Sequence, residues 1–254
     1  MEKAIFRNLL DKVLTEKGIV SKCYSKFHNY SLANQLLAFE QLSERGMDLS
    51  PIAPYKKWNE LGRQVKKGSK ALALYVPRIH KREDANGEEK QYVTFKLLNK
   101  FFSADQTEGD GSIPEDKSLE GKWSAKKALE ALDIEQVKYT KANGNIQGYA
   151  KNREVAINPV AESPLKTLFH EIAHVVLGHT KEITMTDSDV TPRNIMEVEA
   201  ESVAFILCEL LGANGSEESK GYVQGWLQND TVSEQSAQKI FSCADKILKA
   251  GLND

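Results

Sequence analysis

The sequence predicts an α+β protein of two domains, and three observations lead to that fold class. The chain has 254 residues, of which 41% are hydrophobic, so two modest cores can be formed. Its charge is divided: residues 1–100 contain 19 Lys and Arg against 11 Asp and Glu, whereas residues 101–254 contain 15 against 25. The basic part includes a strand pair, and the acidic part is dominated by helical spacing. This asymmetry indicates two domains with different partners.

A polar segment separates the two expected domains. Residues 105–121 read DQTEGDGSIPEDKSLEG and are rich in Gly, Asp, Glu and Ser. Such a composition does not bury a core and is typical of a linker or a long surface loop. We therefore expect a small mixed domain over residues 1–104, a linker over 105–121, and a second domain over 122–254.

The first domain is predicted to contain helices and a long β-hairpin. Residues 2–17 and 30–45 have the apolar spacing of helices that bury one face. Residues 71–77 and 91–98 have the composition of strands, and an Asn-Gly pair at 86–87 is a strong turn signal between them. The hairpin is therefore the main β-element expected in this domain.

The second domain is predicted to combine a few strands with longer helices. Ser163 is a candidate cap before the helix that carries Pro164, and Gly178 is a plausible end for that helix. The expected elements are a helix at 125–133 capped by Ser124, strands at 136–140 and 153–157, helices at 164–177, 193–211, 217–229 and 233–250, and a polar loop at 180–192.

The segment LFHEIAHVVLGH carries the strongest chemical signal in the sequence. His170 and His174 are four residues apart, so on a helix their imidazoles lie on one face and can reach one zinc ion. Glu171 lies between them in the sequence and points toward the water that the zinc would hold. Zinc lowers the pKa of such a water to about 7, and the Glu171 carboxylate can then take its proton.

A catalytic zinc needs a third protein ligand, which we expect from the helix NIMEVEAESVAFILCEL. Glu197 and Glu201 share one helix face, so we predict Glu197 as the ligand and Glu201 as a hydrogen-bond partner of a ligand imidazole. Glu199 points elsewhere and is expected on a solvated face. His179, just beyond Gly178, is a candidate for the metal, for a transition-state oxyanion or for a hydrogen-bonded helix end.

This order of motifs, His-Glu-x-x-His and then Glu-x-x-x-acid on the following helix, resembles gluzincin metallopeptidases. The resemblance implies a zincin fold for the second domain, a carboxylate third ligand, Glu171 as general base and hydrolysis of peptide bonds by a zinc metalloendopeptidase. The sequence departs from many gluzincins at Glu201, where they have Asp.

The basic part has the composition of a surface for single-stranded nucleic acid. Residues 56–82 contain nine Lys and Arg against one acid, Glu60, with aromatic residues among them. Basic groups neutralise phosphates and aromatic rings stack on unpaired bases. The equal alternative is a solvated charged face with aromatic residues in the core. The candidate DNA-binding residues are Lys56, Lys57, Trp58, Arg63, Lys66, Lys67, Lys70, Tyr75 and Arg78.

Three segments of the first domain resemble the N-terminal domain of ArdC-type antirestriction proteins: FHNYSLANQLLAFEQ, YKKWNELGRQVKKGSKALALYVP and NKFFSADQT. The second domain of that family is a zincin, and here LFHEIAH, EVEAESVAFILCELLG and YVQGWLQND fit it in order. The resemblance implies that the first domain binds single-stranded DNA. It also implies that the protein protects the incoming DNA of a conjugative element from restriction.

The main hypothesis is a zinc peptidase with a DNA-binding domain, and two other functions remain open from the residues. One is a non-catalytic DNA-binding protein with a structural zinc site. The other is a DNA-activated protease that cleaves a repressor of the mobile element. The N-terminal residues do not have the pattern of a signal peptide, and the sequence has no run of about 20 apolar residues. We therefore expect a cytoplasmic protein without a membrane partner.

Overall fold

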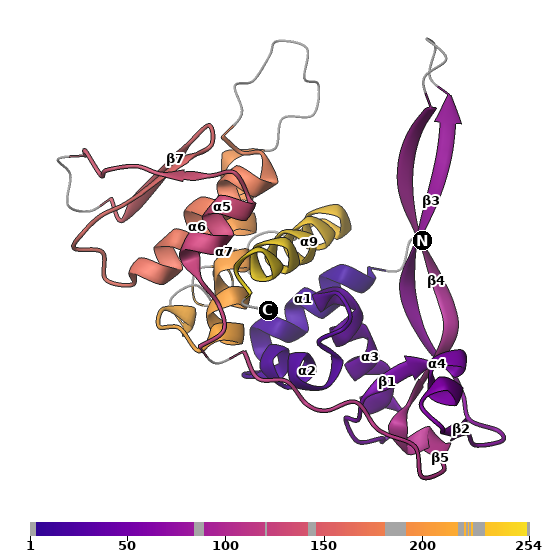
Figure 1. Cartoon of the computed structure of the whole chain (residues 1–254). Helices are drawn as coiled ribbons and strands as arrows, with labels where there is room; N and C mark the ends of the chain where they lie inside the picture. Colours follow the sequence, from indigo (N-terminus) through magenta and orange to yellow (C-terminus); the bar gives the residue numbers. More distant parts are fainter. Residues whose placement is uncertain are drawn as a thin grey trace. The chain divides into compact units, whose positions relative to one another are not determined.

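The computed structural model describes residues 4–83, 89–119, 121–141, 146–180, 192–217, 221, 223, 225 and 232–252. The chain divides into two compact units (Figure 1). Unit 1 comprises Met1–Lys22, Ser31–Ala33 and Ser118–Asp254, and unit 2 comprises Cys23–Tyr30 and Asn34–Lys117. The expected combination of helices and sheets is confirmed. No helix of the described residues is long and apolar enough to cross a membrane.

The first 22 residues group with the C-terminal part of the chain, unlike the expected domain over residues 1–104. Helix α1 (Ile5–Thr15) buries four apolar side chains and packs against α9 (Glu234–Gly251). The Glu234 carboxylate also accepts hydrogen bonds from the backbone N–H groups of Phe6 and Arg7, at 2.8 and 3.0 Å. These bonds satisfy free donors at the start of α1 and attach it to unit 1.

Unit 2 contains a three-stranded antiparallel sheet in the order β1-β4-β3 and a two-stranded pair, β2 with β5. Its strands are β1 (Ile52–Pro54), β2 (Gln64–Val65), β3 (Leu72–Glu83), β4 (Glu89–Ser103) and β5 (Thr107–Glu108). Its helical segments are part of α2 (Ile19–Phe27), most of α3 (Leu32–Glu44), α4 (Tyr55–Glu60) and the short η1 (Ala104–Gln106). The segment 105–108, which belongs to η1 and β5, was expected to be the start of the linker.

Two amide side chains of α3 extend the sheet at the edge of β3. Asn34 accepts a hydrogen bond from the backbone N–H of Tyr75 and donates one to its carbonyl, at 2.8 and 2.9 Å. Gln41, two helical turns later, makes the same pair of bonds with Ala73, at 2.8 and 2.9 Å. Because both amides satisfy backbone groups of an edge strand, α3 fixes the base of the hairpin.

The hairpin of β3 and β4 is longer than the strands predicted at 71–77 and 91–98, although both predictions are confirmed in type. The expected turn at 86–87 lies outside the described residues. Cross-strand partners share a face, and the register pairs Ile79 with Val93 and Pro77 with Phe95. One face of the hairpin is therefore apolar from the Tyr75–Leu97 pair to the Ile79–Val93 pair, and it becomes polar at the Lys81–Gln91 pair.

Unit 1 places a small sheet, in the order β6-β8-β7, against the helix that carries the histidines. Its further elements are α5 (Ala125–Ala131), β6 (Glu135–Gln136), β7 (Gly148–Lys151), β8 (Glu154–Ile157), α6 (Pro164–Leu177) and α7 (Arg193–Leu211). Strand β7 is antiparallel to β8, whereas β6 is parallel to it. Helix α6 packs against β7, β8 and α7, and Phe169, Ile172 and Val198 are fully buried there.

The helix ends follow most of the signals in the sequence. Pro164 begins α6, and Gly178 ends it in the left-handed conformation with φ 82°. Ser124 accepts a hydrogen bond from the backbone N–H of Lys127 and caps α5 as expected. The expected side-chain cap by Ser163 is wrong, because its side chain makes no capping bond. The helix expected at 217–229 and the loop at 180–192 lie largely outside the described residues.

Candidate metal centre

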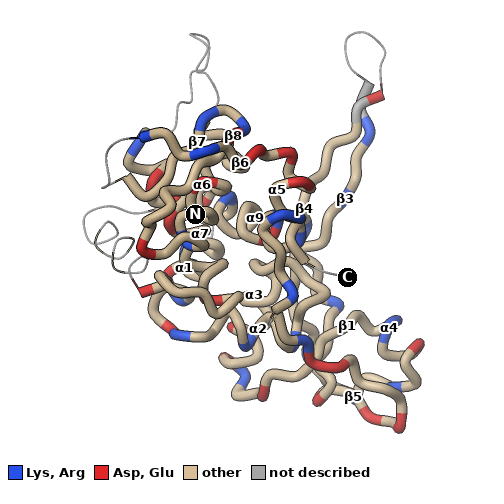
Figure 2. The backbone as a smooth tube through the Cα atoms, turned by 60° about the vertical axis from the view of Figure 1, so that its left-hand side comes forward, with Lys and Arg blue, Asp and Glu red and all other residues tan. Residues whose placement is uncertain are grey.

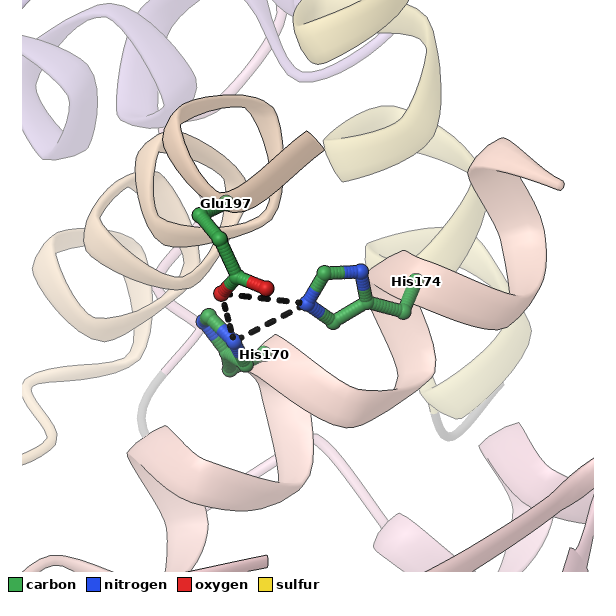
Figure 3. A group of neighbouring side chains, drawn as sticks. All are labelled: His170, His174 and Glu197. Atoms are coloured by element: carbon green, nitrogen blue, oxygen red, sulfur yellow. Dashed lines mark hydrogen bonds and ion pairs between the residues drawn. The ribbon is translucent and has the colours of Figure 1, made fainter. Parts of the chain in front are cut away.

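Three side chains of unit 1 converge on one point between α6 and α7 (Figure 3). The Nε2 atoms of His170 and His174 are 3.0 Å apart. The Oε2 atom of Glu197 lies 3.5 Å from the first and 3.6 Å from the second. Ligand atoms about 2.0–2.1 Å from one tetrahedral ion are about 3.3 Å apart. The three atoms therefore have the spacing of ligands that share a metal ion.

The other nitrogen of His170 is held by a carboxylate. Its Nδ1–H donates to Glu201 Oε2 at 2.8 Å, and Glu201 Oε1 accepts from Lys166 Nζ, also at 2.8 Å. A neutral imidazole that donates through Nδ1 keeps a lone pair on Nε2. The Lys166–Glu201 pair thus directs the free nitrogen of His170 toward the other two ligand atoms, which is the arrangement that a metal ion requires.

The electrostatics of the cluster favour a cation. Burial would lower the pKa of His170, but the Glu197 and Glu201 carboxylates outweigh it and raise the pKa to about 9. Burial would likewise raise the pKa of Glu201, yet His170 and Lys166 lower that pKa to about 2. Hydrogen bonds with His170 and His174 hold the pKa of Glu197 far below its usual range. A positive charge at this point is therefore stabilised, whether a proton or a metal ion supplies it.

Glu171 lies beside the three ligand atoms and is buried. Burial raises the pKa of its carboxyl group, although the two neighbouring histidines oppose the shift. Gly148 of β7 leaves room for it, because a Cβ at that position would lie 2.9 Å from Glu171 Oε1 and 2.7 Å from Thr167 Cγ2. The carboxylate is thus confined between α6 and the sheet.

A cleft of about 700 Å³ opens over these residues. Its wall on one side is β7, and its other walls come from α6, the start of α7 and the residues after Gly178. The lining includes Gly148, Tyr149, Ala150, Lys151, His170, Glu171, His174, Arg193, Met196 and Glu197. This volume is within the range of small-molecule and peptide side-chain sites. Strand β7 was not predicted, because GYAK is short and has two small residues.

Glu199 corrects the prediction of a solvated side chain. Its exposed fraction is 1%, and its Oε2 accepts a hydrogen bond from His179 Nε2 at 3.0 Å. Burial would raise the pKa of Glu199, but the His179 bond, the Ser236 hydroxyl and the Lys239 charge together lower it. The Nδ1 atom of His179 is 3.0 Å from Nδ1 of His174. The His179 backbone N–H donates to the His174 carbonyl at 2.9 Å, which is the hydrogen-bonded helix end among the three roles that were open for His179.

The structure removes Trp58 from the candidate DNA-binding residues. Its exposed fraction is 0%, and its indole N–H donates to the Phe102 carbonyl at 2.9 Å. The ring packs with Ala53 and Ala104 in a small core of unit 2. A ring inside a core has no free face for a base, so the expectation of stacking was wrong and Trp58 stabilises the fold.

The other candidate DNA-binding residues are exposed or half-buried but have different roles. Figure 2 marks the Lys and Arg positions along the backbone, with Asp and Glu positions among them. The Arg63 guanidinium donates to Thr107 Oγ1 at 2.8 Å and to the Gly109 carbonyl at 2.9 Å, so it holds the loop after β5. Lys66 Nζ donates to the Asp105 carbonyl at 2.9 Å. The residues Lys56, Lys57, Lys67, Lys70 and Arg78 are exposed, and Tyr75 is half-buried.

Comparison with known proteins gives a family match for residues 13–103 and one relative over most of the chain. Residues 13–103 match the model of the N-terminal domain of anti-restriction factor ArdC. An uncharacterized protein of Bacillus anthracis, pXO2-81, is 26% identical in an alignment that covers 92% of this chain. The chain spans about half of that relative, 48% of its residues.

Two crystal structures of the antirestriction ArdC protein from the R388 plasmid have the same fold. The metal-free structure is 23% identical, covers 96% of this chain and 94% of its own, and gives a TM-score of 0.51. The Mn(II)-bound structure is 20% identical, covers 97% and 96% respectively, and gives a TM-score of 0.52. Residues 13–103 therefore belong to the ArdC N-terminal domain family, and the chain as a whole has the fold of ArdC.

Proposed function

We propose that this chain is a zinc-dependent peptidase joined to a single-stranded-DNA-binding domain, and that it serves antirestriction on a conjugative or other mobile element. The convergence of His170, His174 and Glu197 beside buried Glu171 carries the proposal. Two histidines and one glutamate are a donor set of catalytic zinc. The Mn(II)-bound R388 protein supports a divalent ion in this fold. The three described cysteines are free thiols, which fits the cytoplasm.

The residues around the metal position suit hydrolysis of an amide. A zinc ion held there would lower the pKa of a bound water and polarise the substrate carbonyl. Glu171 is confined beside that position with a raised pKa, so its carboxylate can take a proton from the attacking water and pass it to the leaving amine. The Lys166–Glu201 pair keeps His170 in the orientation in which Nε2 is free.

The edge of β7 supports a peptide as the substrate. In the described sheet β7 pairs with β8 alone. The Asn158 N–H donates to the Gln147 carbonyl, so the register leaves the backbone groups of Gly148 and Ala150 pointing away from β8. Both residues line the cleft beside the metal ligands. An extended peptide can add to such an edge and place a carbonyl at the metal position.

A pair of variants tests the peptidase function. We expect Glu171→Gln to bind one zinc per chain, as wild type does, and to cleave casein at least about 100-fold more slowly, because it lacks the proton acceptor. Glu197→Ala should lose the zinc itself. Zinc content by mass spectrometry and casein cleavage measure the two effects separately. Unchanged cleavage by Glu171→Gln would refute the mechanism, and intact antirestriction in that variant would favour the non-catalytic DNA-binding alternative.

The outer hairpin of unit 2 supports the DNA-binding half of the proposal. Ile79, Val93 and Phe95 on its apolar face have exposed fractions of 67, 53 and 58%. Arg78 and Lys96 lie on the opposite face of the same strands. Exposed apolar patches of this kind mark interaction sites. We propose that unpaired bases stack on Phe95 while basic side chains along the hairpin contact phosphates.

A further inference from the structure

A chain of hydrogen bonds connects a buried carboxylate to the second histidine ligand. Glu199 Oε2 is 3.0 Å from His179 Nε2, and His179 Nδ1 is 3.0 Å from His174 Nδ1. The side chains of Glu199 and His179 have exposed fractions of only 1 and 6%. Water therefore has little access to the bonds of this chain, and each bond depends on its protein partner.

The backbone at the end of α6 brings His179 back onto His174. Gly178 ends α6 with φ 82°, a conformation that other residues rarely adopt, and the His179 N–H donates to the His174 carbonyl at 2.9 Å. The rings of His174 and His179 are then 5.1 Å apart between centroids and tilted by 66°. The helix end thus places the His179 ring against a metal ligand.

The hydrogen bonds determine which nitrogen of each ring carries the proton. A neutral imidazole has one donor and one acceptor nitrogen. For the Nε2 of His174 to face the metal as a lone pair, its Nδ1 must carry the hydrogen and donate it to His179 Nδ1. The His179 ring must then carry its own hydrogen on Nε2, where the Glu199 carboxylate accepts it. A carboxylate cannot donate when ionised, so Glu199 fixes the direction of the whole chain.

We propose that Glu199 is a positioning residue of the metal centre, which acts through His179 to hold His174 in the tautomer that binds the ion. His170 receives the same help directly from Glu201, at 2.8 Å. The two histidine ligands are therefore oriented by two glutamates of α7, one directly and one through an intervening ring. This inference rests on the metal site of the proposed function and not on peptide hydrolysis.

The amide in Glu199→Gln tests the direction of the chain. Unlike a carboxylate, an amide can also donate to His179 Nε2, which permits the reversed chain with the hydrogen on the ligand nitrogen of His174. We expect zinc affinity, measured by competition with a chelator, to fall about 10- to 100-fold. Glu209→Gln, the same change on the same helix, should leave it unchanged, although Glu209 bonds to the Gly18 N–H.

Two variants of the intervening ring separate the relay from a general effect on folding. In His179→Gln the side-chain oxygen can accept from His174 and the amide nitrogen can donate to Glu199. Zinc affinity in this variant should therefore stay near that of wild type. In His179→Leu neither bond is possible, and affinity should fall as in Glu199→Gln. Equal affinity in wild type, Glu199→Gln and His179→Leu would overturn the proposal.

Nitrogen-15 spectra of the metal-free protein give a readout that needs neither zinc nor peptidase activity. We expect the His174 ring to be the single Nδ1–H tautomer in wild type and a mixture of the Nδ1–H and Nε2–H tautomers in Glu199→Gln. The same single tautomer in both proteins would also overturn the relay. A failure of casein cleavage in wild type would sink the peptidase function alone and leave this result standing.

Discussion

The metal centre of unit 1 buries charged side chains, whereas the outer hairpin of unit 2 exposes apolar ones, and both are opposite to the usual distribution in a folded protein. The metal centre buries charge: Glu171, Glu199 and Glu201 have exposed fractions of 7, 1 and 7%. The hairpin exposes apolar surface, with Ile79 and Phe95 more than half exposed. Buried charges destabilise a fold unless they are paired, and exposed apolar faces lose the gain from burial.

The difference teaches how each region can be tested. In the metal centre the partners of Glu199 and Glu201 are histidines of the same chain, and a bound cation would complete the pairing. On the hairpin Phe95 is 58% exposed among the described residues, so the partner that we propose for it is an external one. Small changes should therefore act on geometry in the first region and on an external contact in the second.

The largest effect is expected from adding one methyl group to the metal centre. In Gly148→Ala the new carbon would meet Thr167 Cγ2 at 2.7 Å and Glu171 Oε1 at 2.9 Å, so Glu171 has to move. We expect casein cleavage to fall about 100-fold, because a displacement of about 1 Å can have that effect, while zinc stays bound. Gly221→Ala, which adds the same carbon where nothing lies within 4 Å, is the control. Full cleavage by Gly148→Ala would show that Glu171 is not confined.

The histidine ligands could be predicted because one helix sets their geometry. A spacing of four residues places His170 and His174 on one face whatever surrounds the helix, and the same holds for Glu197 and Glu201. Glu199 was missed because helical spacing alone directs it away from that face. Its partner His179 reaches it only after the left-handed turn at Gly178, and spacing does not show which element packs beyond such a turn.

The candidate DNA-binding residues were harder to predict because composition does not show which face of an element is buried. Trp58 and Phe95 are both aromatic residues in a basic region, yet the first is fully buried and the second is exposed. The core formed with Ala53 and Ala104 decides the first case, and Ala104 lies far from Trp58 in the sequence. Arg63 shows the same limit, since its charge is used to hold the loop after β5.

A matched pair of aromatic residues tests the hairpin. Phe95 lies on the apolar face, whereas Tyr92 lies on the opposite face and stacks on His80 with ring centroids 5.0 Å apart. Loss of one stacked base costs about 1–3 kcal/mol, so Phe95→Ala should weaken binding of single-stranded DNA about 5- to 160-fold. Tyr92→Ala should have little effect. Fluorescence anisotropy with a labelled oligonucleotide measures both, and equal losses would exclude the apolar face as the contact.

Charge reversal of Lys66 and Lys67 tests two candidate DNA-binding residues outside the hairpin. Both ammonium groups are exposed, and phosphate contacts are not specific for sequence. The double variant should bind every oligonucleotide more weakly and show a smaller dependence on salt. An unchanged affinity and salt slope would restrict the contact surface to the hairpin itself.

The smallest effect is expected from pH on the metal-free protein. The folded state raises the pKa of His170 from 6.5 to about 9, against the effect of burial and through Glu197 and Glu201. A raised pKa means that the folded state binds the proton more tightly. This stabilisation is complete below pH 6.5 and is lost as pH rises through about 9.

The urea midpoint of chelator-treated protein should therefore fall over this interval. His170→Gln should show a smaller fall, and bound zinc should abolish it, because the ion takes the place of the proton between the ligands. A wild-type midpoint that stays constant without metal would mean that the carboxylates around His170 do not hold a charge there, and the tight pairing that distinguishes the metal centre from the hairpin would then be absent before the ion binds.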